Sequence, residues 1–490
     1  MLFPILSVII FTPLIAGVII LLLPANRKAE VRVVALAAAS VTLALSVWAY
    51  FSYNITAGGY QLVEKVPWLP ALGISYYLGI DGISAPLVLL GGIVLLCGVL
   101  ISWGVEDRPR EFFAFLMILG TSVLGVFCSL DLFELFFFFE IAVFPKYLMI
   151  AVWGYPKTRE YGAMKLTLYL FIGSLISLVG ALAMYFASGL HTFDMLALEK
   201  AGFSLAFQHL WFPVVFMGFA ILGGIFPFHS WAPDGHVAAP TAISMLLAGV
   251  EMKVGAFAAL RVAIMLMPDG IKYWAPWILA LATVNVVYGA AIAMVQKDFK
   301  YVIGFSSISH MGLVLIGFAT LSPVGLMGAG MQMFSHGVMT ALFFAVVGMV
   351  YDRAHTRDIS KLGGLFKKMP WAAIGFIVAG LVSMGMPGFS GFVAEFPIFM
   401  GAWQSEPWVA LVAALGIIIT AAYIFRLIER VFFGELPPAL ETQVGDVTVL
   451  DKVAVSLLAA LMVALGLFPS LMVPMIQSGV NHVMRLLGGA

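Results

Sequence analysis

The sequence predicts an all-α polytopic membrane protein of about 14 transmembrane helices, because of its composition and its recurring apolar stretches. Of the 490 residues, 62% are hydrophobic and only 10% are charged, a composition far from that of a soluble globular domain. Apolar stretches of about 20 residues, the length that crosses a bilayer, follow one another along the whole chain. We therefore expect residues 1–490 to form a single membrane domain in a lipid bilayer.

Fourteen stretches are long and apolar enough to be spans. Their approximate cores are 3–23, 33–53, 79–103, 112–130, 132–153, 166–187, 211–227, 239–267, 274–295, 301–320, 325–350, 371–400, 408–433 and 453–475. The first has no basic leader or small-residue cleavage site before it, so we expect a span and not a removed signal peptide. Trp103, Trp153 and Trp274 lie near expected span ends, where aromatic residues favour the membrane–water interface.

Lys and Arg are distributed unequally between alternate loops. One set of loops holds 18 of the 25 basic residues, the other set holds 4, and the remaining three lie within spans. The positive-inside rule places the richer set in the cytoplasm. We therefore expect a multi-pass protein of the bacterial inner membrane with both termini on the outer side, which an even number of spans requires.

The sequence offers no recognisable site for a cofactor, a metal ion or a nucleotide. The formal net charge is zero, so nothing predicts a nucleic-acid partner. No phosphate loop or dinucleotide-binding glycine motif is evident. Cys97 and Cys128 have no second Cys or His at ligand spacing, and the eight histidines show no arrangement typical of haem. We expect the chain to hold no cofactor and no metal.

Five ionisable residues lie well inside the apolar stretches: Glu140, Lys253, His310, His336 and Glu395. An ionisable group at the centre of a bilayer costs about 2.5–3.5 kcal/mol on insertion scales, and such groups usually mark ion or proton pathways. The alternatives are ordinary ones: a packing hydrogen bond for a carboxylate, snorkelling for a lysine and a packed ring for a histidine. The five residues together favour a functional path.

Helix breakers interrupt the seventh and the twelfth expected spans. Pro227 and Pro233 lie in the seventh, and Pro387 and Pro397 lie in the twelfth. Interrupted segments at corresponding positions indicate the inverted repeats of a transporter, although Pro and Gly are also commoner in membrane helices generally. We expect two inverted five-helix repeats, flanked by further helices. The boundaries are 1–110 for helices 1–3, 111–267 for helices 4–8, 268–434 for helices 9–13, and 435–490 for helix 14.

Several motifs resemble those of the antiporter-like subunits of respiratory complex I. The motifs are FPFHSWAPDGHVAAPTAIS (226–244), QKDFK (296–300), SHMG (309–312), SHG (335–337), HTRDI (355–359) and GFVAEF (391–396). The resemblance spans nearly the whole chain and extends to Mrp-type sodium/proton antiporters and membrane-bound hydrogenases. Within the complex I family, Glu395 favours the subunit M branch, which has Glu where its sister subunits usually have Lys.

The resemblance implies a role for each of the five residues. Glu140 matches the fifth-helix carboxylate that gates or stabilises the channel entrance, and Lys253 matches the central lysine of the eighth helix. His310 and His336 match relay histidines, which suit proton transfer because imidazole titrates near neutral pH. Glu395 matches the terminal proton site, where a broken helix supports a buried charge.

One position departs from the family. Leu222 stands where the family carries a seventh-helix lysine that pairs with the residue matching Glu140. Lys146, six residues after Glu140 and next to Pro145, is the candidate replacement, provided that a kink at the proline brings the two together. The alternative is that Lys146 snorkels towards the cytoplasmic end of its helix.

Other charged residues leave the choice of role open. Glu251 lies about 200° around the helix from Lys253, so the two do not share a face; it is a possible site residue. Lys300 is either an orientation signal of its loop or, since it matches a family lysine, a residue beside the entry path. Asp234 and His236 are expected to cap the eighth helix, or else to admit protons.

The function that the resemblance implies is proton translocation within an enzyme complex. We expect a non-redox subunit of an NADH (or other donor):quinone oxidoreductase, with protons moving from the cytoplasm outwards along a Glu–Lys–His–Glu axis. Redox chemistry in other subunits supplies the drive, so neighbouring membrane-arm subunits are expected partners. The alternatives are an Mrp-type sodium/proton antiporter subunit, the membrane arm of a hydrogenase or inorganic-carbon uptake complex, and a structural scaffold.

Overall fold

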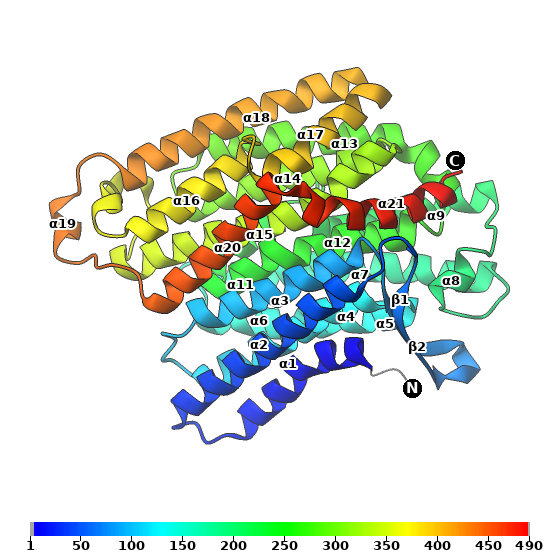
Figure 1. The fold of residues 1–490 in the computed structure, drawn as a ribbon, viewed down its shortest axis with the longest axis horizontal. Helices are drawn as coiled ribbons and strands as arrows, with labels where there is room; N and C mark the ends of the chain where they lie inside the picture. The colour runs from blue at the N-terminus through cyan, green and yellow to red at the C-terminus, as the bar shows by residue number, and fades with distance from the viewer. Residues whose placement is uncertain (1–3, 489–490) are drawn as a thin grey trace.

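The computed structural model describes residues 4–488, whose helices form a bundle running along the horizontal axis of Figure 1. Within residues 4–488, thirteen helices are long and apolar enough to cross a membrane. The uninterrupted spans are α1 (Ile5–Leu22), α2 (Lys28–Ser52), α3 (Ser84–Ile101), α4 (Pro109–Cys128), α7 (Arg159–Ala187), α13 (Pro268–Val295), α14 (Phe299–Ala319), α15 (Pro323–Ala354) and α20 (Val449–Leu467). The remaining spans are interrupted or joined pieces. The predicted helical membrane fold is confirmed.

The seventh and twelfth spans are broken, as predicted. In the seventh, α9 (Leu205–Gly223) is separated from α10 (Trp231–Ala238), and Gly224 has a φ of +79°. In the twelfth, α16 (Pro370–Ser383) is separated from α17 (Ser390–Ser405), and Gly385 and Gly388 have φ values of +62° and +91°. Glycine accepts these left-handed conformations without the steric cost of a Cβ atom. The breaks therefore free backbone groups in the interior of the bundle.

The same capping arrangement occurs in both halves of the chain. Asp131 accepts hydrogen bonds from the first turn of α5 (Leu132–Ile141) and forms an isolated β-bridge with Asp194, which caps α8 (Met195–Leu198). Asp298 likewise caps α14 and forms an isolated β-bridge with Asp358. The two bridges are five spans apart in the chain, so they lie at opposite ends of the bundle. This recurrence supports the expectation of inverted repeats.

The eighth span lies at the centre of the bundle and is entirely buried. It consists of α11 (Thr241–Leu246), a π-helical turn η2 (Leu247–Glu251), α12 (Met252–Ala258) and a second π-helical turn η3 (Ala259–Ile264). Widened turns of this kind are frequent at functional sites. The span packs against α9 so closely that a Cβ atom at Gly255 would lie 2.6 Å from the backbone nitrogen of Gly223.

One end of the bundle contains structure that the sequence did not predict. Residues expected to be a loop and the start of the third span form an antiparallel hairpin, β1 (Gln61–Leu69) and β2 (Ile74–Ile80), so α3 begins only at Ser84. The last span ends at Leu467, and a separate helix, α21 (Val473–Leu486), follows where 453–475 was expected to be continuous. The hairpin, α8 and α21 gather at the right end of Figure 1, near both chain ends.

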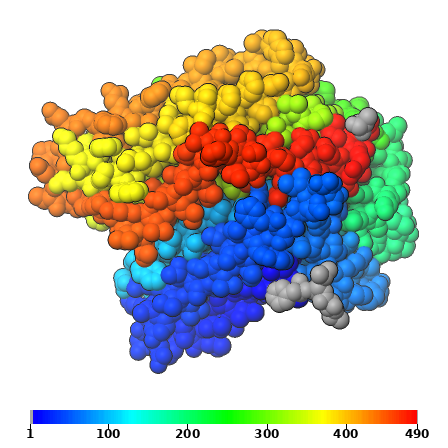
Figure 2. Space-filling model, in the orientation of Figure 1, coloured from blue at the N-terminus to red at the C-terminus, as the bar shows by residue number. Residues whose placement is uncertain are grey.

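Two further spans are composite. The fifth consists of α5 and α6 (Val143–Trp153), which meet at Ala142. The thirteenth consists of α18 (Pro407–Leu427) and a π-helical turn η6 (Ile428–Phe432), after which the chain passes through α19 (Pro438–Glu441) at the left end of Figure 1. In Figure 2, α20 and α21 lie between the N-terminal helices and the yellow and orange helices of the second half. The C-terminal segment therefore connects the two sides of this face.

Candidate functional site

Lys253 lies at the centre of the bundle with its side chain completely buried. Its ammonium donates a hydrogen bond to the carbonyl oxygen of Ala248, one residue of the π-helical turn η2. Among the residues that the structure describes, no carboxylate forms an ion pair with it. A buried cation that is held only by a carbonyl is costly to keep charged. This arrangement suits a group that gains and loses a proton.

Two histidines and a carboxylate form a cluster between α14, α15 and α17. The imidazole rings of His310 and His336 stack with their centroids 5.2 Å apart and their planes at 10°. The Nε2 atom of His310 lies 3.6 Å from Oε1 of Glu395. All three side chains are buried. The predicted residues His310, His336 and Glu395 are therefore brought together.

The ring of His310 is oriented by its neighbours. Its Nδ1 atom lies 2.8 Å from the carbonyl oxygen of Ser306, which can only accept, so Nδ1 donates. The other ring nitrogen, Nε2, lies 3.2 Å from the carbonyl oxygen of Ser383 and 3.3 Å from its hydroxyl, so it can accept from the hydroxyl in the neutral ring and donate to the carbonyl in the protonated ring. A proton that arrives at Nε2 therefore faces Glu395 directly. Both ring nitrogens of His336 lack a hydrogen-bond partner among the described residues.

The carboxyl group of Glu395 is only partly bound. Gln332 donates a hydrogen bond of 3.1 Å to Oε1, while Oε2 has no partner in the described part of the chain. Gly385, in the break of the twelfth span, leaves room for this oxygen, because a Cβ atom there would lie 2.9 Å from Oε2. The broken helix thus creates the space that the carboxylate occupies.

His236 is a buried histidine that was expected from the sequence to cap the eighth helix or else to admit protons. Both of its ring nitrogens lack a hydrogen-bond partner within residues 4–488, and its ring contacts Trp231 and Phe344. Lys300 and Lys253 are both close enough to act on it electrostatically. The expectation that Asp234 and His236 cap the eighth span is wrong, since the cap residue is Pro240. Its unpaired nitrogens, which no sequence pattern reveals and which it shares with His336, make His236 a further candidate for the site.

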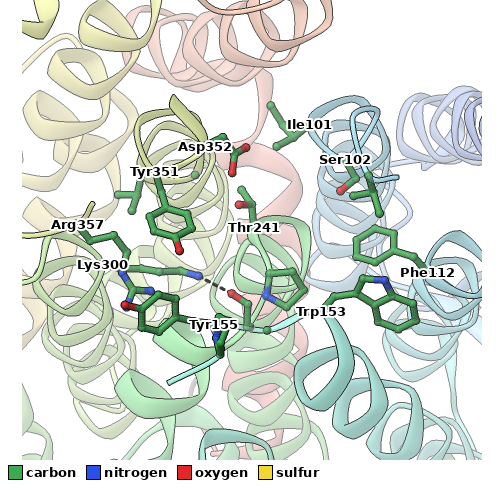
Figure 3. A pocket seen from close by; sticks show the side chains of 17 residues that line it. Ile101, Ser102, Phe112, Trp153, Tyr155, Thr241, Lys300, Tyr351, Asp352 and Arg357 are labelled. Carbon is green, nitrogen blue, oxygen red and sulfur yellow. Dashed lines mark hydrogen bonds between the residues drawn. The ribbon is translucent and has the colours of Figure 1, made fainter. Parts of the chain in front are cut away.

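A cavity of about 270 Å³ leads inwards from the end of the bundle that carries the basic loops. Asp352 lies at its exposed margin, and the buried Lys300 lies inside, donating a 2.6 Å hydrogen bond to the carbonyl of Ala239 (Figure 3). Arg357 and Tyr351 form one side of the cavity and Trp153 lies on the other. Lys300 is therefore a buried side chain that lines a cavity at this end of the bundle.

Glu140 lies well inside an apolar stretch of the sequence, but it is not buried within this chain. Its side chain is exposed on the α5–α6 surface, in a row with Phe137 and Phe144, which are 44% and 65% exposed. These residues share one face because they are spaced by three and four positions along a helix. The buried carboxylate of this segment is instead Glu134, which accepts a 3.0 Å hydrogen bond from the backbone of Tyr77.

Lys146 forms an ion pair, but not with the residue that we expected. Its Nζ atom lies 2.5 Å from Oε2 of Glu251, and both side chains are buried. The fifth span bends at Ala142, three residues before Pro145, whose ring conflicts with a regular helix at that point. Six residues of helix place Lys146 and Glu140 about 120° apart around its axis, so Lys146 is buried in the bundle while Glu140 is exposed on its surface. The hypothesis of a Lys146–Glu140 pair is therefore wrong, and snorkelling is excluded too.

A second buried ion pair lies towards the hairpin end of the eighth span. Arg261 donates hydrogen bonds of 2.8 Å to Asp81 and 2.7 Å to the hydroxyl of Tyr60. The other carboxylate oxygen of Asp81 accepts from the backbone of Ile83 and Ser84, at the start of α3. Within residues 4–488, no three His, Cys, Asp or Glu side chains are arranged to hold a metal ion.

The family described as NADH:quinone oxidoreductase/Mrp antiporter, TM, matches residues 129–420, more than half of the chain. The chain belongs to this family. NAD(P)H-quinone oxidoreductase chain 4 of Gloeobacter violaceus is 37% identical over 480 residues, covering 96% of this chain and 90% of that protein. NADH-quinone oxidoreductase subunit M of Rhodobacter capsulatus is 36% identical over 499 residues, covering 98% and 96%.

A solved structure extends the family relationship to the whole fold. A chain of respiratory complex I from Thermus thermophilus with bound NADH matches with a TM-score of 0.91 and 29% identity, over 99% of this chain and 100% of that one. The expected resemblance to the antiporter-like subunit M is confirmed. The protein is an antiporter-like, multi-pass membrane subunit of the complex I type, related to Mrp antiporters.

Proposed function

We propose that this chain translocates protons as a non-redox membrane subunit of a complex I-type quinone oxidoreductase. The observation that carries the proposal is the row of buried, incompletely paired ionisable groups through the bundle. Lys300 lies at the cavity, Lys253 at the centre, and the His336–His310 stack ends at Glu395. Buried ionisable groups that lack fixed partners are expensive in a membrane, and function is the usual reason for their presence.

The proposed path begins at the cavity on the side of the basic loops, which the positive-inside rule assigns to the cytoplasm. A proton reaches Lys300 through the cavity and passes His236 to Lys253. His236 is buried and both of its ring nitrogens lack a partner among the described residues, so we assign it the role of a transient carrier between the two lysines. In a bacterial inner membrane this orientation puts both chain termini on the outer side. We take the proton to move from the cytoplasm to the outside.

The proposed exit runs from Lys253 to Glu395. His336 receives the proton first in this path, because it stacks on His310, and His310 is the ring that faces Glu395. This order reverses the two histidines relative to their order in the sequence. Each proton moved against 100 mV costs about 2.3 kcal/mol. Redox chemistry in other subunits supplies that free energy.

Glu140 indicates where a neighbouring subunit binds. An exposed carboxylate between Phe137 and Phe144, nine residues into the fifth span, would face hydrocarbon in an isolated chain. A partner subunit of the membrane arm that offers a cation or a hydrogen-bond donor removes this cost. Glu140 then senses the charge state of that neighbour, which gives the carboxylate its proposed gating role.

The division into repeats also stays a proposal. We assign residues 111–267 and 268–434 to the two inverted repeats, with 1–110 and 435–490 outside them. The matching Asp131–Asp194 and Asp298–Asp358 bridges and the two broken spans support this division.

Substitution of the terminal carboxylate tests the proposed function. The intact complex is reconstituted in liposomes, and the ratio of protons moved to electrons transferred is measured for the wild type and for Glu395→Gln. The amide keeps the shape and the Gln332 contact but cannot carry a proton. We expect assembly and uncoupled electron transfer to persist while the ratio falls. An unchanged ratio would favour a scaffold.

The family relationship keeps sodium/proton antiport as the second candidate, because its description includes Mrp antiporters. The same vesicles discriminate between the two functions. Sodium-driven proton movement without NADH or another electron donor, lost in Glu395→Gln, would support an antiporter. Proton movement that requires electron transfer and ignores sodium would support the oxidoreductase. Subunits copurifying with the complex identify its donor module, including a hydrogenase or an inorganic-carbon uptake system.

A further inference from the structure

The Lys146–Glu251 ion pair lies off the path described above. Lys146 belongs to α6 and Glu251 ends the π-helical turn η2, so the pair joins the fifth and eighth spans. Its two side chains are 3% and 2% exposed. Isolated buried ion pairs often stabilise a protein less than apolar residues of similar volume. Helix packing alone therefore does not account for the pair.

The pair has unused hydrogen-bonding capacity, unlike the Arg261–Asp81 pair. Both carboxylate oxygens of Asp81 are bound, one of them by two backbone amides. In contrast, Oε1 of Glu251 has no partner among the described residues, and its only neighbour of opposite charge is Lys146. An unpaired carboxylate oxygen at this depth is the atom at which a proton can bind without breaking another hydrogen bond.

A small cavity of about 10 Å³ adjoins both charged side chains. It is lined by residues of α4, α5, α6, α9 and the eighth span, among them Ser122, Phe138 and Leu222. This volume is about the minimum that holds one water molecule. The pair therefore has room for a proton-carrying water. Because Leu222 lines the same cavity from α9, a cation placed there would also face Glu251.

Glu251 and Lys253 are connected through one turn of helix. The ammonium of Lys253 is held by the carbonyl of Ala248, which lies in the same π-helical turn that ends at Glu251. Two residues of separation place their side chains on different faces of the span. A change of charge at Glu251 is thus close to Lys253 but separated from it by the helix backbone.

We propose that Glu251 is a second proton-binding site, which controls Lys253 through the pair with Lys146; this rests on the proposed function. With Glu251 ionised, the two opposite charges nearly cancel at Lys253. When a proton from the aqueous phase reaches Glu251 Oε1 through the cavity water, which passes on one proton as it receives another, the carboxylate becomes a neutral acid and the ammonium of Lys146 keeps its charge. The uncompensated positive charge repels the proton on Lys253 and drives it towards His336. Loss of the proton from Glu251 resets the pair.

The test uses the intact complex in liposomes with four variants. Glu251→Gln keeps the shape and the Lys146 hydrogen bond but cannot titrate, whereas Glu251→Asp still can. Lys146→Met with Leu222→Lys moves the cation to the opposite wall of the cavity. Lys253→Met serves as the reference for a blocked path. The readouts are subunit composition, electron transfer with an uncoupler, and the ratio of protons to electrons.

We expect Glu251→Gln to assemble and transfer electrons but to lose proton movement to the level of Lys253→Met. Glu251→Asp and the Lys146→Met/Leu222→Lys double variant are expected to retain proton movement well above that level. Infrared difference spectra of the working wild type should show a protonated-carboxyl band that Glu251→Gln removes. A wild-type proton ratio in Glu251→Gln, with proton movement lost in Lys253→Met, would overturn this proposal alone. A wild-type ratio in Lys253→Met would instead refute the proposed function.

Discussion

The Arg261–Asp81 pair allows a quantitative prediction, because the two partners differ in what remains when the other is removed. Arg261→Met leaves Asp81 with its two backbone donors and the favourable field at the start of α3. Asp81→Ala leaves a buried guanidinium with the hydroxyl of Tyr60 and the rings of Tyr60 and Phe257. It also removes the cap of α3. We therefore expect Asp81→Ala to be the more destabilising substitution.

The expected sizes follow from the contacts. Breaking a buried ion pair costs about 3–5 kcal/mol, and the retained donors place Arg261→Met near 3 kcal/mol. Losing a helix cap adds about 1 kcal/mol, so Asp81→Ala should lower the free energy of unfolding by about 5 kcal/mol or slightly more. A loss of about 5 kcal/mol changes the unfolding equilibrium roughly several-thousand-fold. Reversible unfolding by dodecyl sulfate in mixed micelles measures both. The reasoning would be refuted if the two variants lost equal unfolding free energy, if Arg261→Met lost more than Asp81→Ala, or if either lost less than about 1 kcal/mol.

Two further substitutions test the exit and the partner surface. Gly385→Ala places an alanine in a left-handed backbone conformation, which costs about 1–2 kcal/mol, and the added Cβ atom would displace Oε2 of Glu395. We expect this variant to move protons more slowly, while electron transfer measured with an uncoupler stays intact. Gly388→Ala is the matched control, since its φ is also positive but nothing lies within 4 Å of its Cβ; equal effects would contradict the argument. Glu140→Leu should leave the stability of the isolated subunit nearly unchanged but lower the amount of neighbouring subunits that copurify with it. Phe144→Leu, the control on the same face, should not lower that amount. Normal recovery of neighbouring subunits with Glu140→Leu would exclude a role of Glu140 in assembly.

Composition and periodicity predicted the spans well, because hydrocarbon imposes the same length and apolarity on each of them. The breaks in the seventh and twelfth spans were predictable from their prolines and glycines. The hairpin and α21 were not, because short elements at the membrane surface combine polar and apolar residues and resemble loops. Their structure depends on contacts such as the hydrogen bond from Ser478 to the carbonyl of Ile55.

The central part of the candidate site was also predictable at the level of residues. Lys253, His310, His336 and Glu395 are buried, as charged residues in long apolar stretches should be if they serve a path. Partners across helices were not predictable. The Lys146–Glu251 contact joins residues 105 positions apart and depends on how the fifth and eighth spans pack, which the sequence does not specify.

The exposure of individual side chains was the other property that could not be predicted from the sequence. A carboxylate after four phenylalanines is expected to be buried, yet Glu140 lies on the surface because α5 presents Phe138 and Phe139 to the interior instead. Which face of an apolar helix points inwards depends on its neighbours, since every face is apolar enough for lipid. The same limit applies to His236, whose importance follows from its lack of polar partners.

The measurement that most directly tests the central claim is the proton-to-electron ratio of the intact complex carrying Lys253→Met. The substitution keeps the length and the apolar stem of the side chain. It removes the buried ammonium at the centre of the proposed path, the only one there among the residues that the structure describes. We predict a complex that assembles, transfers electrons in the presence of an uncoupler, and moves fewer protons per electron. A wild-type ratio from a fully assembled Lys253→Met complex would contradict the proposed path.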